Sequence, residues 1–165
     1  MWNGSAPWMN EPAMQSDTGD DSFLRETERF FHDQIPITRA MGVVVESFGS
    51  GQLVLTAPLD LNHNHLGTAF GGSLGAIATL AGYGLLWLLL DDRRAHIVIK
   101  SSSIHYRQPV TGVIRAVCQQ PGDEDVEHFL ERFRRKGKAS IRLRATIEEA
   151  GRTCVDFEGL FVAGR

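Results

Sequence analysis

Hydrophobic residues recur along the chain in two rhythms, one typical of strands and one typical of helices. Over residues 138–149 apolar and polar side chains alternate, with Ile141, Leu143, Ala145 and Ile147 on one side. This alternation predicts a strand with one buried face. Over residues 123–135 the spacing is instead i, i+3, i+4, i+7, carried by Val126, Phe129, Leu130 and Phe133. That spacing predicts an amphipathic helix.

The remaining pattern predicts a chain dominated by strands. A first helix is expected at 21–35, ended by Pro36. The predicted strands are 42–48, 51–57, 95–110, 112–120 and 153–162, with turns at Gly49-Ser50-Gly51 and Ala150-Gly151. Strands and helices do not alternate as repeating βαβ units, which argues against a doubly wound parallel sheet.

The run from Gly71 to Leu90 contains twenty residues without a charge, long enough to span a membrane. Five of its residues are glycines, and no second such run exists. The other segments are amphipathic strands that need a covering element, so a buried core helix is favoured. We therefore predict an α+β fold in which a curved antiparallel sheet wraps around one long apolar helix, at about residues 71–91.

Composition places the chain among ordinary single-domain proteins. Its 165 residues are enough for one core, and residues 1–20, rich in Pro, Gly, Ser, Asn and Asp, are predicted to be a flexible tail before a domain at 21–165. The net charge of −3 gives no general attraction for nucleic acid or an anionic membrane. Cys118 and Cys154 fall in strand-like segments and are predicted to be buried, reduced thiols. No secretory signal is visible, so a cytoplasmic location is expected.

The chemistry concentrates where a polar loop, residues 59–70, meets the start of the long apolar helix. Gly71 and Gly72 follow this loop directly. Free N–H groups at a helix start can hold an oxyanion or a polarised carbonyl, and glycine lets a carbonyl approach closely. Tight packing of the helix on the sheet would also explain both glycines, and local spacing does not decide between these two explanations.

The same segment resembles a known superfamily. Asn-x-x-Gly-Thr-x-x-Gly-Gly at 64–72 is similar to the loop of hotdog-fold acyl-CoA thioesterases of the phenylacetate-pathway type. Gly67–Leu90 and Ile97–Val110 resemble more closely the thioesterase-like domains similar to the C-terminal half of YiiD. The resemblance covers roughly residues 22–163. It implies a hotdog fold with an added helix at 123–135.

The resemblance also implies roles for individual residues. Asn64 falls where an asparagine orients substrate or water, and Gly71, with Gly72 beside it, where a backbone N–H polarises the thioester carbonyl. Two positions depart from the phenylacetate-type pattern, since Phe70 replaces a histidine and Thr79 replaces the catalytic carboxylate. A hydroxyl cannot act as a base near neutral pH, although it can position a water. The general base is therefore left unassigned.

Several polar residues are candidates for the missing proton transfer or for substrate contact. His63 and His65 in the loop suit proton transfer near neutral pH. No acidic or cysteine residue lies near them in the sequence, so a metal site is not expected. Further candidates for substrate contact, any of which can equally be structural, are Phe70, Ser73, Tyr83, Trp87, Ser101, Ser102, Ser103 and His105. Coenzyme A carries phosphates, which Arg93, Arg94, Arg107 or the cluster at 132–138 could contact.

Three functions remain open. The first is a thioester hydrolase acting on acyl-CoA or acyl-carrier-protein substrates, without a cofactor or metal. The second is a dehydratase or another lyase on the same substrates, disfavoured because the long helix has no acid before Asp91. The third is a non-catalytic acyl-thioester binder, favoured by the absent carboxylate. The open sheet edges of a hotdog domain predict a homo-oligomer, a dimer or a dimer of dimers, with no nucleic-acid or membrane partner.

Overall fold

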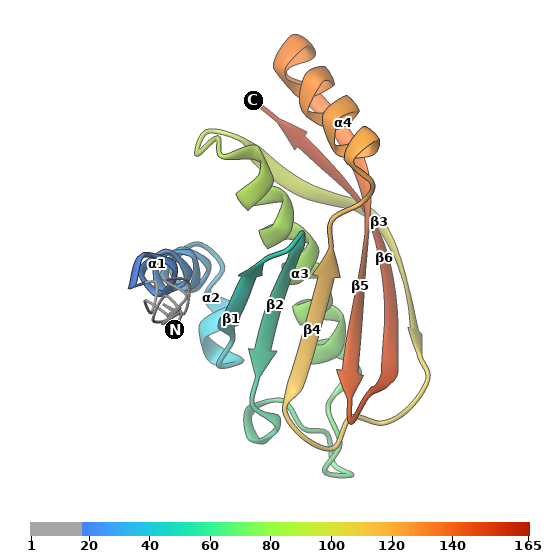
Figure 1. Ribbon diagram of the computed structural model, residues 1–165. Coiled ribbons are helices and arrows are strands. Elements are labelled where there is room, and N and C mark those ends of the chain that lie inside the picture. Colours follow the sequence, from blue (N-terminus) through green and yellow to red (C-terminus); the bar gives the residue numbers. More distant parts are fainter. Residues whose placement is uncertain (1–17) are drawn as a thin grey trace, which may run out of the picture.

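The computed structural model describes residues 18–165 and forms one curved sheet around a central helix (Figure 1). The predicted tail lies outside the described residues except for its last three positions, which belong to the first helix. The elements are α1 (Thr18–Gln34), α2 (Pro36–Ala40), β1 (Val44–Gly49), β2 (Gln52–Ala57), η1 (Leu59–Leu61), α3 (Gly71–Leu90), β3 (His96–Tyr106), β4 (Ile114–Gln119), α4 (Asp123–Lys136), β5 (Lys138–Glu149) and β6 (Arg152–Gly164).

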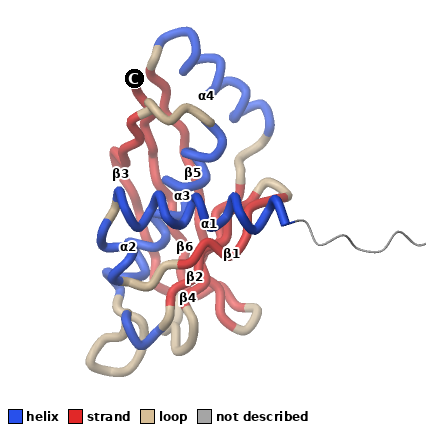
Figure 2. The backbone as a smooth tube through the Cα atoms, turned by 90° about the vertical axis from the view of Figure 1, so that its left-hand side faces the viewer, coloured by secondary structure: helices blue, strands red, loops and turns tan. Residues whose placement is uncertain are grey.

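The six strands form one antiparallel sheet in the order β1-β2-β4-β5-β6-β3. The two terminal positions of the sheet are occupied by β1 and β3. The helix α3 lies in the hollow of this sheet, and α1 and α2 lie on the side that the curved sheet leaves open (Figures 1 and 2). This arrangement confirms the predicted α+β architecture and the predicted position of the long helix.

The helix α3 is a core element. By length and composition it could cross a membrane, but 56% of its most apolar 18-residue window is buried within the protein. It crosses the sheet closely at Gly82, where an added Cβ would lie 2.5 Å from Cζ of the buried Phe161 ring. The helix ends at Asp91, whose φ of 46° is left-handed. Its burial is partial, because one stripe of the helix lines a cavity described below.

The N-terminal helices pack on α3 through aromatic rings. Phe30 stacks on Trp87 at 4.4 Å between ring centroids, and Phe31 is fully buried. Pro36 ends α1 as predicted, but it also begins α2, which the pattern did not predict. Proline suits the first turn of a helix because the N–H it lacks would have no partner there. Trp87 is thus a core residue.

The end of β3 and the start of α1 differ most from the prediction. Strand β3 ends at Tyr106 rather than 110, because the N–H groups of Arg107 and Gln108 both donate to the Cys154 carbonyl and Pro109 has no N–H. Strand β6 extends to Gly164, two residues beyond the predicted end. The other elements lie within two residues of their predicted bounds, apart from α1, which begins at Thr18. Cys118 and Cys154 are buried free thiols, as predicted.

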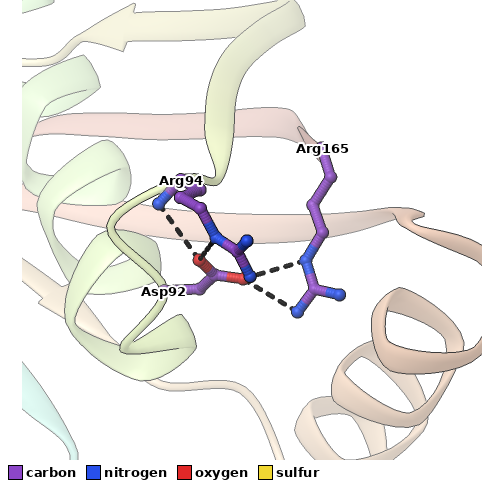
Figure 3. Close-up of polar contacts among 3 residues, drawn as sticks. All are labelled: Asp92, Arg94 and Arg165. Carbon is purple, nitrogen blue, oxygen red and sulfur yellow. Dashed lines mark hydrogen bonds and ion pairs between the residues drawn. The ribbon is translucent and has the colours of Figure 1, made fainter.

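The helix α4 packs against β5 at the end of the sheet where β6 also ends (Figures 1 and 2). Arg165, directly after β6, pairs with Asp92 at 2.8 Å and lies over the Phe133 ring of α4. Asp92 also accepts a 3.0 Å hydrogen bond from the Arg94 N–H (Figure 3). These contacts hold the pKa of Asp92 below its ordinary value, the Arg94 N–H being the largest cause. They fasten the end of α3 to β6 and α4.

Candidate active site

The loop before α3 is anchored by a buried asparagine that the sequence did not single out. Asn62 is 2% exposed, and its Nδ2 donates to the carbonyls of Met41 and Pro58, both at 2.8 Å. The backbone carbonyl of Asn62 accepts the Phe70 N–H at 2.7 Å. Asn62 therefore joins the end of α2 and the end of β2 to the residue that precedes α3. Only its place in the polar loop at 59–70 could have indicated this role.

Asn64 closes the tip of the same loop. Its Oδ1 accepts the backbone N–H groups of Leu66 at 2.8 Å and Thr68 at 3.3 Å. Its Nδ2 donates to the Thr68 hydroxyl at 2.9 Å, which leaves one N–H of the amide for another partner. The geometry gives Asn64 a structural task. Its predicted role in orienting substrate or water stays a prediction, now limited to that remaining N–H.

The first turn of α3 offers donors without acceptors. Phe70 is the N-cap residue and its side chain makes no capping hydrogen bond. Within residues 18–165, no hydrogen bond uses the N–H groups of Gly71, Gly72 or Ser73. Such groups carry the partial positive charge of the helix start, so they can stabilise a carbonyl oxygen that gains negative charge.

Two exposed aromatic rings frame these donors. The Phe70 ring lies over Gly72, so closely that a side chain at position 72 would clash with it. The Tyr106 hydroxyl donates to the Gly71 carbonyl at 3.0 Å. A cavity of about 340 Å³ opens at this point, lined by Gly71, Leu74, Tyr106 and Arg107 among others. Arg107 is paired with Asp156, which lines a different cavity on the outer face of the sheet. Tyr106 was not among the candidates, although it lies in the quoted 97–110 segment.

A larger apolar cavity of about 650 Å³ follows along α3. Its helical wall includes Gly75, Thr79 and Tyr83, which are four residues apart and therefore share one face. The opposite wall is formed by β3 at 97–99, and α1 and α2 close one side. The Thr79 hydroxyl donates to the Gly75 carbonyl at 2.8 Å. Burial raises the pKa of Tyr83, so its phenol is neutral at physiological pH.

Neither cavity contains an obvious general base. No Asp, Glu or His lines them in the described part of the chain. His63 lies on the loop with its Nδ1 2.9 Å from the Asn64 carbonyl, and His65 is exposed on the same loop. No group of three or more His, Cys, Asp or Glu among residues 18–165 is placed to hold a metal.

The register of β3 separates the candidates on that strand. Ser102 pairs with Gly159, on the sheet face that carries the buried Phe161 and faces α3. Ser103 pairs with Glu158 and His105 with Asp156, so both lie on the outer face, where they line a cavity with Arg144. The structure thus brings Ser102 to the helix side, and it does not bring Ser103 or His105 near Gly71 within one chain.

The other basic candidates also lie away from the helix start. Arg93 lies 3.7 Å from the centre of the Trp87 ring, and Arg94 lies beside Asp92. Arg132, Lys136 and Lys138 line a groove on the outer face of the sheet. Of the basic residues proposed to contact phosphates, Arg107 alone lines the cavity at Gly71.

Comparison with known proteins places this geometry in a recognised group. Residues 24–165 match the family model described as "Putative thioesterase (yiiD_Cterm)". A protein of unknown function from Chlorobaculum tepidum is 35% identical, with a TM-score of 0.81 over 88% of this chain and 96% of that one. A putative thioesterase from Shewanella oneidensis is 29% identical, with a TM-score of 0.76 over 88% of this chain and 99% of its own.

The fold extends to more distant proteins. A probable thioesterase from Pseudomonas aeruginosa has a TM-score of 0.74 at 23% identity, over 85% of this chain and 94% of its own. At that identity the likeness concerns the fold alone. The curved antiparallel sheet around α3 is the hotdog fold that the motifs predicted.

Proposed function

The chain belongs to the putative thioesterase family of the YiiD C-terminal type, and on this basis we propose that it hydrolyses acyl-CoA or acyl-carrier-protein thioesters. The observation that carries the proposal is the set of three N–H groups at Gly71, Gly72 and Ser73, which have no acceptor within residues 18–165 and lie next to an apolar cavity. A thioester has the two matching parts, a polar carbonyl and an apolar acyl chain.

The carbonyl oxygen is proposed to accept hydrogen bonds from the first turn of α3. Water attack on the carbonyl carbon moves negative charge onto this oxygen. Fixed donors then stabilise the transition state more than the ground state, and one such donor commonly contributes roughly 10²–10³ in rate. Gly71 has no side chain to block the approach, whereas the space over Gly72 is occupied by the Phe70 ring.

The acyl chain is proposed to occupy the 650 Å³ cavity, which is within the usual size range of small-molecule sites. The Thr79 hydroxyl donates its proton to Gly75, so its oxygen is left to accept a hydrogen bond from the attacking water. This orients the water without deprotonating it. His65 and the free N–H of Asn64 are the other groups proposed to assist.

A second candidate is an acyl-thioester binder without hydrolytic activity. The observation that favours it is that, among the described residues, no Asp, Glu or His lines either cavity. A lyase on the same substrates needs a proton-transfer group as well, so it gains no support from this lining.

We also propose that the active form is a homo-oligomer built on β3. This strand is 11 residues long, lies at the edge of the sheet and exposes Val98, Ile99 and Tyr106. Long apolar edges favour pairing with another copy.

Antiparallel pairing of two β3 strands would set the Tyr106 end of one copy beside the Ile97 end of the other. The carbonyl site of each copy would then face the acyl cavity of its partner. Light scattering at micromolar concentration tests this, and a monomer would contradict it.

The test of hydrolysis compares wild type with two variants of Asn64. Asn64→Asp keeps the acceptor for the Leu66 and Thr68 N–H groups and can accept from the Thr68 hydroxyl, but it removes both amide N–H groups and adds a negative charge. Asn64→Ala removes the whole loop contact. Free thiol and substrate mass are followed for a panel of acyl-CoAs and acyl-carrier-proteins of short, medium and long chain. Thermal unfolding of each variant controls for damage to the loop.

Wild-type thiol release that falls at least tenfold in Asn64→Asp, with its unfolding temperature maintained, supports the proposal. A fall confined to Asn64→Ala restricts Asn64 to its structural task and leaves the hydrolase in place. If no substrate releases thiol while binding is detected, the non-catalytic binder replaces the hydrolase. A change of substrate mass with the thioester intact identifies a lyase.

A further inference from the structure

The outer face of the sheet carries a groove of about 610 Å³ between α4 and β3. Its floor follows from the strand register, because Ser140 of β5, Val162 of β6 and Val98 of β3 stand in one row. The neighbouring residues Phe161 and Ala163 are buried on the other face, which holds α3. The groove therefore opens away from the Gly71 site of the same chain.

Four cations line this groove, and no acid does. They are Lys100 of β3, Arg132 and Lys136 of α4, and Lys138 at the start of β5. Within residues 18–165, none of the four forms an ion pair with an acidic side chain, and no Asp or Glu lines the groove. Charges of one sign in one concavity repel each other and focus a positive potential there.

The rest of the same face shows the opposite arrangement. Arg142 and Arg144 both pair with Glu158, at 2.8 and 2.9 Å. The groove is thus a local concentration of unneutralised positive charge on a chain whose net charge is −3. General basicity of the protein does not explain it.

The floor of the groove is apolar. Val98 is 60% exposed, and Leu160 and Val162 are partly exposed beside it. A rim made only of hydrogen-bond donors and a floor of aliphatic side chains suit a ligand with both anionic groups and a flat apolar part. A nucleotide has this composition, with phosphates and a base.

We propose that this groove binds a nucleotide with two or more phosphate groups, whose phosphates contact the four cations and whose base lies on Val98, Leu160 and Val162. The volume of about 610 Å³ is within the range of small-molecule sites. The nucleotide is either the 3′-phosphoadenosine diphosphate part of coenzyme A or a free nucleotide. The proposal rests on the groove and does not depend on thioester hydrolysis.

The first experiment is calorimetry with adenosine 3′,5′-bisphosphate, coenzyme A and unphosphorylated adenosine as probes. The variant is Lys136→Gln/Lys138→Gln, which removes two cations of the groove, and the control is Arg144→Gln, which removes one exposed cation of the same face outside the groove. We expect both phosphorylated probes to bind and adenosine not to bind. The double variant should weaken binding at least tenfold, the control less than twofold, and added salt should weaken wild-type binding.

A second experiment identifies the source of the nucleotide by comparing KM for an acyl-CoA with KM for the same acyl-pantetheine, which has no nucleotide. A rise in KM for acyl-CoA alone in the double variant assigns the groove to the substrate. Nucleotide binding with unchanged KM assigns it to a free nucleotide. If the protein hydrolyses neither compound, the calorimetry still decides the groove.

Three outcomes would overturn the proposal. The first is that neither phosphorylated probe binds, and the second is that the double variant and Arg144→Gln weaken binding equally. The third is that only an RNA oligomer or an acidic protein binds at the groove. The unfolding temperature of the double variant is measured alongside, and because both lysines are exposed we expect it to match wild type.

Discussion

The Tyr106 hydroxyl donates a hydrogen bond of 3.0 Å to the Gly71 carbonyl and so fastens the end of β3 to the first turn of α3. A Cβ on Gly71 would lie 3.5 Å from Tyr106 Cζ, so the ring lies within van der Waals reach of any side chain placed at this position. The residue whose N–H is proposed to hold the substrate carbonyl is therefore positioned by a strand 35 residues further along the chain.

Replacing Tyr106 by phenylalanine should lower kcat more than it raises KM. The ring stays in place, but the first turn of α3 loses its contact with β3, so the donors at Gly71 are less well aligned for the transition state. We expect kcat to fall about three- to tenfold, and the free energy of unfolding to fall by about 1 kcal/mol, the usual net value of one hydrogen bond. Steady-state kinetics and urea unfolding measure these changes.

Tyr83→Phe is the matched control for the stability measurement. Within the described residues burial is the one cause that raises the pKa of Tyr83, and no hydrogen bond to its hydroxyl contributes, so its removal should change the free energy of unfolding by less than about 0.5 kcal/mol. Equal destabilisation by both substitutions would contradict a specific role for the Tyr106 hydroxyl.

The elements were predictable where one physical signal dominates. The uncharged run at 71–90 predicts a core helix, and the alternation at 138–149 predicts a half-buried strand. Helix α2 was missed because five residues are too few to show a period. The end of β3 was misplaced because it depends on the Cys154 carbonyl, which is distant in sequence.

The candidate site was predictable only as far as one segment contains it. The loop and Gly71-Gly72 are contiguous, so a motif marks them. The sheet places Tyr106 and the walls of the acyl cavity next to α3. No local sequence pattern predicts the contact between Tyr106 and Gly71, which are 35 residues apart. Ser102 and Ser103 lie on opposite faces because strand side chains alternate, but the bulge between Ile99 and Ser101 decides which of them faces α3, and the sequence does not reveal this bulge.

Two glycines of α3 should respond oppositely to alanine. At Gly82 a Cβ would lie 2.5 Å from Cζ of Phe161, a ring that is 1% exposed and cannot move away easily. Overpacking of this kind costs about 1–3 kcal/mol. At Gly75 the nearest atoms are at 3.8 and 3.9 Å, so alanine should stabilise the helix by about 0.5–1 kcal/mol. Urea unfolding compares the two variants, and equal effects would contradict the close crossing at Gly82.

Both thiols should be unreactive in the native protein. Cys118 is fully buried, and burial raises its pKa to about 12, while Cys154 is 1% exposed. Since the thiolate is the reactive form, a thiol reagent at pH 8 should modify neither residue until the protein unfolds. A colorimetric thiol assay in increasing urea should show both thiols appearing with the unfolding transition. Rapid labelling of either thiol without urea would contradict the packing described here.

Acid should loosen the contact that holds the loop after β3. Glu149 accepts hydrogen bonds from the N–H groups of Thr111 and Gly112 at 2.9 and 2.6 Å, and the Thr111 N–H is the largest cause of its lowered pKa. A carboxyl group whose pKa is lowered by folding stabilises the native state above its unfolded pKa, about 4.3, and this contribution is lost as pH falls through the native value. The loop carries Val110, whose carbonyl accepts the Ala69 N–H beside the site.

Glu149→Gln should therefore be less stable than wild type at pH 7 and should lose less stability on acidification. The difference arises because glutamine has one acceptor oxygen and no charge to titrate. Thermal unfolding between pH 7 and about 3.5 measures both slopes, the range being set by the ordinary carboxyl pKa.

Glu131→Gln is the control, since Glu131 is exposed on α4 and makes no ion pair within residues 18–165. Asp92 and Glu158, whose pKa values are also lowered, titrate in all three proteins, so they cancel in the comparison. Parallel acid profiles for wild type and Glu149→Gln would show that the contact to Thr111 and Gly112 does not contribute to stability.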